Sequence, residues 1–112
     1  MKERDYFDPK FYGTENYWKH WMGFLYTDSL KYFCETYKAF WTLDVVGSYM
    51  PDLKDYDFLV ICFDVDNGQC NFTVREDSNT PIIIQQFIES TDLTVSVRLF
   101  MENKVLLFPS DH

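Results

Sequence analysis

The dipeptide Asn67-Gly68 constrains the fold of this chain more than any other local feature. Both residue types accept the positive backbone angles of a type I′ turn, so Asn-Gly between apolar runs predicts a tight β-hairpin. The turn also sets the register, which is counted outward from it. One face of the predicted hairpin pairs Val65 with Cys70, Phe63 with Phe72 and Ile61 with Val74. The other face pairs Asp64 with Asn71, Cys62 with Thr73 and Val60 with Arg75. Turn chemistry and face polarity agree, so we predict a hairpin with one buried face.

Helical spacing dominates the segments before this hairpin. Thr27 can cap a helix and Asp28 suits its positive N-terminal end. The apolar residues that follow at helical spacing are Leu30, Phe33, Cys34 and Tyr37. A second helix is predicted from about Phe40 to Ser48, ended by Gly47 and then Pro51. A short helix capped by Thr14 is expected over residues 14–21.

Apolar and polar residues alternate in the last part of the chain, which predicts strands. We expect a third strand over Ile82–Ile88 and a fourth over Leu93–Met101. A tight turn would then return the chain as Val105–Phe108, with Leu99 opposite Leu106.

Helices followed by hairpin-linked strands indicate the α+β class. We expect the N-terminal helices to pack on one face of a mainly antiparallel sheet of about four to five strands. The 112 residues are expected to form a single domain. Its parts would be an irregular arm (1–13), a helical region (14–50) and a hairpin-rich sheet (56–110).

The formal net charge of −8 is concentrated in the second half of the chain. Residues 1–54 hold eight acids and seven bases, whereas residues 55–112 hold ten acids and three bases. This balance argues against direct nucleic-acid binding, which needs lysines and arginines to displace counterions. It fits solubility, attraction to a basic partner or mimicry of a nucleic-acid backbone.

No apolar run reaches the ~18 residues of a membrane span, and no signal peptide is visible. The three cysteines have no CxxC spacing and are expected to be reduced thiols. We therefore expect a cytoplasmic protein that does not contact membranes.

Metal and cofactor sites are not predicted. Asp64 to Gly68 resemble the start of a calcium loop, but the loop glycine falls at position five and Arg75 stands at position twelve. The two histidines and scattered cysteines do not match a zinc site either. The hairpin accounts for the calcium-like residues better.

Nucleophilic catalysis would need a nucleophile, a base and an orienting group. The chain offers one such set, Cys34 and His20 with Asp44 or Asp28. Because Cys34 lies on the apolar side of its predicted helix, an inert core thiol is the better interpretation. We therefore expect a protein that is not an enzyme.

Two surface groups are candidates for contacting a partner. The first, named the acidic rim, surrounds the predicted hairpin and comprises Asp52, Asp55, Asp57, Asp64 and Asp66. The second is aromatic and comprises Tyr12, Tyr17, Trp18 and Trp21. Fifteen of the twenty-two aromatic residues lie in residues 1–50, and most are expected in the core.

Four segments carry a resemblance to a known family. They are YGTENYWKHW (12–21), YTDSLKY (26–32), FWTLDVVGS (40–48) and VLLFPS (105–110). In this order they resemble an uncharacterised family of small proteins of bacteria, their phages and other mobile elements. That family has no established activity. The resemblance implies a small cytosolic protein encoded on a mobile element, and short acidic proteins of such elements often block host defence machinery.

The leading functional hypothesis is a non-enzymatic inhibitor of a host nucleic-acid-targeting effector, such as a CRISPR nuclease. The acidic rim would occupy a basic channel of that protein, and the aromatic residues would anchor the contact. The alternative is a small-molecule or peptide module with an aromatic pocket around Trp18, Trp21 and Trp41. A hydrolase built on the cysteine and histidine set is the third hypothesis.

Overall fold

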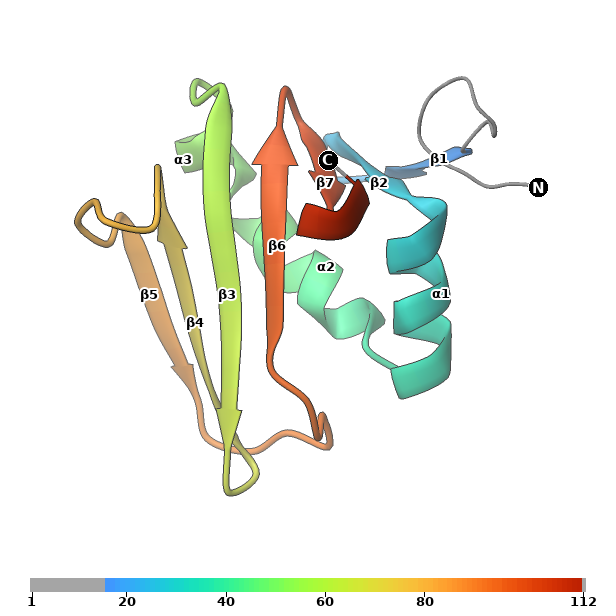
Figure 1. Cartoon of the computed structure of the whole chain (residues 1–112), viewed down its shortest axis with the longest axis vertical. Coiled ribbons are helices and arrows are strands. Elements are labelled where there is room, and N and C mark those ends of the chain that lie inside the picture. Colours follow the sequence, from blue (N-terminus) through green and yellow to red (C-terminus); the bar gives the residue numbers. More distant parts are fainter. Residues whose placement is uncertain (1–15, 112) are drawn as a thin grey trace.

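A seven-stranded mixed sheet forms the centre of the computed structural model, which describes residues 16–111 (Figure 1). The strands are β1 (Tyr17–His20), β2 (Phe24–Thr27), β3 (Phe58–Asp66), β4 (Gln69–Arg75), β5 (Ile84–Ile88), β6 (Val97–Glu102) and β7 (Val105–Leu107). Their order in the sheet is β1-β2-β7-β6-β3-β4-β5. The pair β2–β7 is parallel and the other neighbours are antiparallel. The predicted α+β class is therefore confirmed.

The helices are α1 (Asp28–Tyr37), α2 (Phe40–Ser48) and α3 (Met50–Leu53), and a 3₁₀ turn, η1, spans Pro109–Asp111. In Figure 1, α2 and α3 lie behind β3 and β6, and α1 lies beside β2 and β7. The helices therefore cover one face of the sheet unevenly, with α1 placed near the β1 end.

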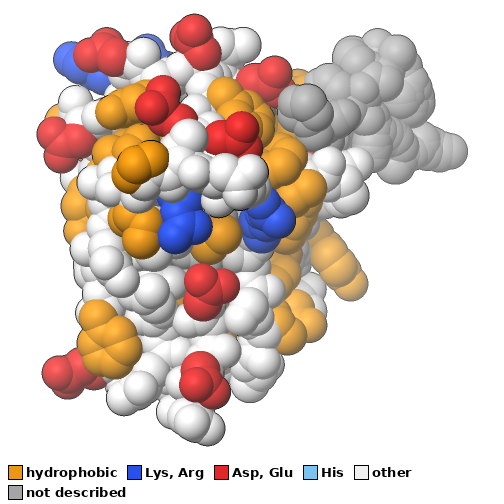
Figure 2. Space-filling model, turned by 60° about the vertical axis from the view of Figure 1, so that its left-hand side comes forward, with side chains coloured by type: hydrophobic (Ala, Val, Ile, Leu, Met, Phe, Trp, Pro, Cys, Tyr) orange, Lys and Arg blue, Asp and Glu red, His pale blue; other side chains and the backbone are white. Residues whose placement is uncertain are grey.

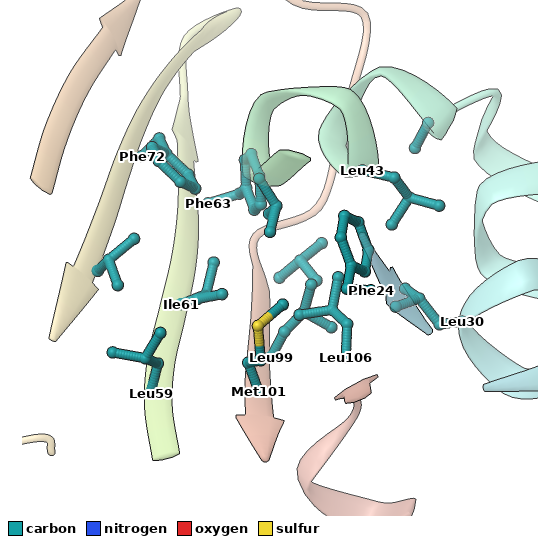
Figure 3. Packing of buried hydrophobic residues seen from close by; sticks show 14 of the residues in the cluster. Phe24, Leu30, Leu43, Leu59, Ile61, Phe63, Phe72, Leu99, Met101 and Leu106 are labelled. Carbon is teal, nitrogen blue, oxygen red and sulfur yellow. The ribbon is translucent and has the colours of Figure 1, made fainter. Parts of the chain in front are cut away.

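The hairpin of β3 and β4 has the predicted register throughout, from Asp66–Gln69 to Val60–Arg75. Asn67 and Gly68 have φ angles of 51° and 75°, as a type I′ turn requires. Its inner face contributes buried Ile61, Phe63 and Phe72 to the core (Figure 3). Leu99 and Met101 of β6, Leu43 of α2 and Leu30 of α1 pack in the same cluster.

Both longer helices begin where the sequence predicts. The side chain of Thr27 accepts a hydrogen bond from the Leu30 backbone N–H (3.4 Å), which caps α1. Lys38 ends α1 in the left-handed conformation with φ 55°, a role that glycine usually takes. Pro51 does not follow the last turn of helix, because it lies in the first turn of α3, where its missing N–H costs nothing.

The short helix expected over residues 14–21 is wrong where the structure describes it, because Tyr17–His20 is strand β1. β1 pairs with β2, and β2 in turn lies parallel to β7, about eighty positions later in the chain. β1 is an edge strand beside β2, and β2 is held in the sheet by the distant β7, so the local spacing of residues 14–21 does not reveal this strand. These two extra strands raise the count from the expected four to five to seven. The arm predicted for residues 1–13 lies outside the described residues.

The last strands follow the prediction with a shifted register. β5 and β6 are shorter than expected at their N-terminal ends. Leu106 lies opposite Met101 instead of Leu99. The cause is the turn, since Asn103 and Lys104 both have positive φ angles (51° and 66°) and form a two-residue connection.

Candidate functional site

The most exposed large aromatic side chain in the described part of the chain belongs to Trp21, at 78% exposure. It lies in the turn between β1 and β2, at the edge of the sheet. Tyr17 and Trp18 of β1 are also exposed. We call β1, β2 and this turn the aromatic hairpin. Three of the four predicted aromatic contact residues therefore lie on the aromatic hairpin, and the fourth, Tyr12, lies outside the described residues.

The ring of His20 packs against the ring of the exposed Trp21. Its ring is only 7% exposed and stacks on Phe24, with centroids 4.6 Å apart, and against Trp21 at 6.0 Å. Nδ1 accepts a hydrogen bond from the Met22 backbone N–H at 3.1 Å. The ring proton therefore lies on Nε2, which donates to Asp44 Oδ1 at 2.9 Å. Stacking and hydrogen bonds together leave the imidazole one orientation.

A close backbone approach joins the aromatic hairpin to α2. A methyl group added at Gly47 would lie 2.5 Å from Met22 Sδ and 2.9 Å from Met22 Cβ. Such distances are too short for carbon and sulfur atoms in contact. Gly47 therefore lets the turn of the aromatic hairpin seat directly on α2.

Trp18 is held by α1 on the other side of β1. Its indole N–H donates to Asp28 Oδ1, and Lys31 Nζ lies 4.4 Å from the ring centroid in a cation–π contact. Asp28 is the acid at the N-terminus of α1. The edge strand is thus tied to a helix by a polar contact and a charged one.

The residues of the hydrolase hypothesis do not form a reactive set. Both ring nitrogens of His20 are already engaged, and Asp28 is bonded to Trp18. Cys34 is fully buried, and burial raises the pKa of its thiol to about 11. A thiol with this pKa is almost entirely protonated near neutral pH and is a poor nucleophile.

The Cys34 thiol predicts a pH dependence of stability. Because its pKa is raised on folding, the folded state favours the protonated thiol, and this contribution is complete below pH 9. It is lost as the pH rises from 9 to 11, by up to roughly 2 kcal/mol. Urea unfolding at pH 9 and pH 11 should show that the free energy of unfolding falls more between these pH values in the wild type than in Cys34→Ser. Equal falls would contradict this assignment.

The acidic rim is divided between the two ends of β3. All five residues are exposed. Asp52, Asp55 and Asp57 precede the strand, whereas Asp64 and Asp66 end it. At ~3.3 Å per residue, Asp57 and Asp64 are about 23 Å apart. The predicted rim is therefore two acidic groups, with the length of the strand between them.

Two hollows include charged or polar side chains in their walls. One, of about 440 Å³, lies between the aromatic hairpin, β7 and η1 and includes Asp111. Asp111 accepts hydrogen bonds from Thr27, Ser29 and the Phe108 N–H, so it fastens η1 to the start of α1. The other, of about 370 Å³, lies on the sheet face away from α2 and α3. Neither hollow has a tryptophan in its wall.

The three tryptophans of the predicted pocket have different surroundings. Trp18 is held by α1 and Trp21 by His20, while Trp41 meets the core residue Phe63 edge-on at 5.9 Å. Within residues 16–111 no three histidine, cysteine or acidic side chains group as a metal site, and no helix there is long and apolar enough to span a membrane.

Comparison with known families matches residues 9–112 to one family model. The chain belongs to DUF6876, a family of unknown function. This agrees with the resemblance to an uncharacterised family. Neither a curated protein nor a solved structure matches the chain.

The structure gives physical roles to three of the segments singled out in the sequence, which lie within the residues matched to DUF6876. The segment 12–21 supplies His20 and Trp18, and the segments 26–32 and 40–48 supply their partners Asp28 and Asp44. The sequence grouped His20 with Asp44 in one candidate catalytic set, with Asp28 as the alternative to Asp44. The bond between Trp18 and Asp28 had no comparable signal.

Proposed function

We propose that this protein is a non-enzymatic binding protein whose aromatic hairpin docks on a basic, nucleic-acid-binding protein and blocks it. A defence effector such as a CRISPR nuclease is the partner class we favour. The observation that carries the proposal is Trp21, an exposed indole supported by a buried histidine.

An exposed tryptophan that rests on a neighbouring ring suits a binding anchor for an energetic reason. Tryptophan is enriched among residues that dominate binding energy at protein interfaces. A side chain already held in one orientation loses less entropy when a partner covers it. His20, bonded to Asp44 and Met22, supplies that support. The aromatic hairpin therefore presents Trp21 for contact without a rearrangement on binding.

The negative charge of the chain supports a basic protein as the partner. The chain carries a net charge of −8, and both acidic groups of the rim are exposed. Such a surface accelerates encounter with a positively charged protein and repels nucleic acid itself. Two acidic groups about 23 Å apart could pair with separate parts of a basic channel. Binding should therefore weaken as salt rises.

The test is capture of a partner from nuclease-treated bacterial lysate at low and high salt, read by mass spectrometry. Asp55→Lys and Asp66→Lys each reverse one charge, one at either end of β3. Glu76→Lys, directly after β4, makes the same charge change outside the five rim residues and is the matched control.

We expect a basic nucleic-acid-binding protein to be retained at low salt and lost at high salt. Either rim variant should reduce retention about threefold to tenfold relative to Glu76→Lys. Equal retention by all three variants would remove the acidic rim from the proposal. Capture of acidic proteins alone would contradict the partner class.

A further inference from the structure

Two arginines share the hollow on the outer face of the sheet. Arg75 ends β4, and Arg98 lies on β6. Both side chains line the same hollow of about 370 Å³, together with Cys62 and Asp64 of β3, which runs between them. Figure 2 shows a small basic patch in the middle of one face, with acidic side chains above and below it.

The register explains why the two arginines converge. Val60 of β3 lies opposite Arg75, and Cys62, two residues further on, lies opposite Arg98. The two arginine backbones are therefore separated by β3 and offset by two residues, about 12 Å in all. Two long side chains directed over β3 can bring both guanidinium groups to one ligand.

Neither arginine forms an ion pair with a carboxylate in the described part of the chain. Arg98 donates a hydrogen bond to Ser78 Oγ, and the side chain of Arg75 makes no hydrogen bond or ion pair within residues 16–111. This is unexpected in a chain with 18 acids and 10 bases. Like charges that share a hollow repel each other, and an anion between them would remove that cost.

The donor set suits a phosphate group. Two guanidinium forks approaching from different strands can each bind two oxygens of a tetrahedral phosphate, whereas a planar carboxylate matches one fork. The oxygen of Ser78 accepts from Arg98, so its own O–H is left to donate into the hollow.

Asp64 restricts the rest of the ligand. Its carboxylate lines the hollow two residues beyond Cys62, about 7 Å along β3. A purely anionic ligand would be repelled there, whereas a hydroxyl group would donate to it. The hollow has the volume of a small-molecule site.

We propose that this hollow binds a small phosphorylated polyol, such as a sugar phosphate, with the phosphate between Arg75 and Arg98 and hydroxyl groups at Asp64. The site lies on the outer face of β3, β4 and β6, whereas the aromatic hairpin is at the β1 edge. The site is therefore separate from the aromatic hairpin, although it shares Asp64 with the acidic rim.

Cys62 provides a reporter within the hollow. Of the three cysteines, Cys34 and Cys70 are buried, whereas Cys62 is partly exposed. A thiol reagent should therefore label the folded protein at Cys62. Burial raises the pKa of this thiol, and Asp64 adds to the increase while the two arginines oppose it. Labelling is best measured near pH 8, as a ratio of rates with and without ligand.

The experiment compares ribose 5-phosphate, inorganic phosphate and ribose at constant ionic strength, with labelling rate and thermal unfolding as readouts. We expect ribose 5-phosphate at about 10 mM to slow labelling at least fivefold, phosphate less and ribose not at all.

Arg75→Met and Arg98→Met should each abolish the protection. Lys54→Met removes one positive charge outside the hollow and should keep it. In Asp64→Asn, inorganic phosphate should still slow labelling, and ribose 5-phosphate should slow it no more than phosphate does.

Unchanged labelling of the wild type by all three compounds would overturn the proposal without any substituted protein. Equal protection of the wild type and Arg98→Met would also overturn it, because the phosphate would then lie elsewhere. Equal protection by ribose and ribose 5-phosphate would remove the phosphate from the proposal.

Discussion

Replacing Phe63 with alanine is expected to lower the free energy of unfolding by about 3–5 kcal/mol. Phe63 is completely buried in the middle of β3, between β4 and β6. Its ring contacts Phe72 at 4.9 Å and Trp41 at 5.9 Å between centroids. Alanine would leave a cavity where the sheet meets α2. A domain of this size has about 5–15 kcal/mol in total, so the variant should be close to unfolding.

Urea denaturation followed by circular dichroism measures this loss. Phe87→Ala is the matched control, because Phe87 is also a strand phenylalanine but is 57% exposed on β5. It should change stability by about 0.5 kcal/mol or less. Similar losses in the two variants would show that the core is not centred on β3.

Replacing Gly47 with alanine is expected to destabilise the protein by about 1–3 kcal/mol and to displace Trp21. Whether Gly47→Ala raises or lowers the free energy of unfolding separates helix propensity from the contact with Met22. In a helix interior, alanine is normally better than glycine by about 0.5–1 kcal/mol, so helix propensity alone predicts stabilisation. Here the new methyl group would lie 2.9 Å from Met22 Cβ, an atom close to the backbone that cannot swing aside.

The displacement should appear as a change in tryptophan fluorescence, because Trp21 rests on His20 and the turn that contains Met22. Met22→Ala in the same chain should recover part of the stability, since it removes the sulfur atom 2.5 Å from the added methyl. Stabilisation by Gly47→Ala would mean that the aromatic hairpin does not seat on α2.

Local chemistry made the central part of the fold predictable. The Asn67-Gly68 turn determines the β3–β4 register by itself, and Thr27 marks the start of α1 within one residue. The β1–β2 pair was not predictable in this way. Its position depends on β7, and the aromatic spacing of residues 17–21 is as compatible with a helix as with a strand.

The candidate sites show the same division. The sequence singled out His20 and Asp44, and the structure joins them, but as supports of an exposed tryptophan. The shared hollow of Arg75 and Arg98 needs the register of β6 as well as that of β4. Because acids outnumber bases in the second half of the chain, its two isolated arginines form no basic pattern in the sequence.

The most direct test of the proposed function is the contribution of Trp21 to partner binding. Wild type, Trp21→Ala and Phe87→Ala would be compared for retention of the same basic protein from nuclease-treated lysate at low salt. Both variants remove an exposed aromatic ring, one from the aromatic hairpin and one from the opposite edge of the sheet. We predict at least a tenfold loss for Trp21→Ala and full retention by Phe87→Ala. Equal retention by all three proteins would contradict the account.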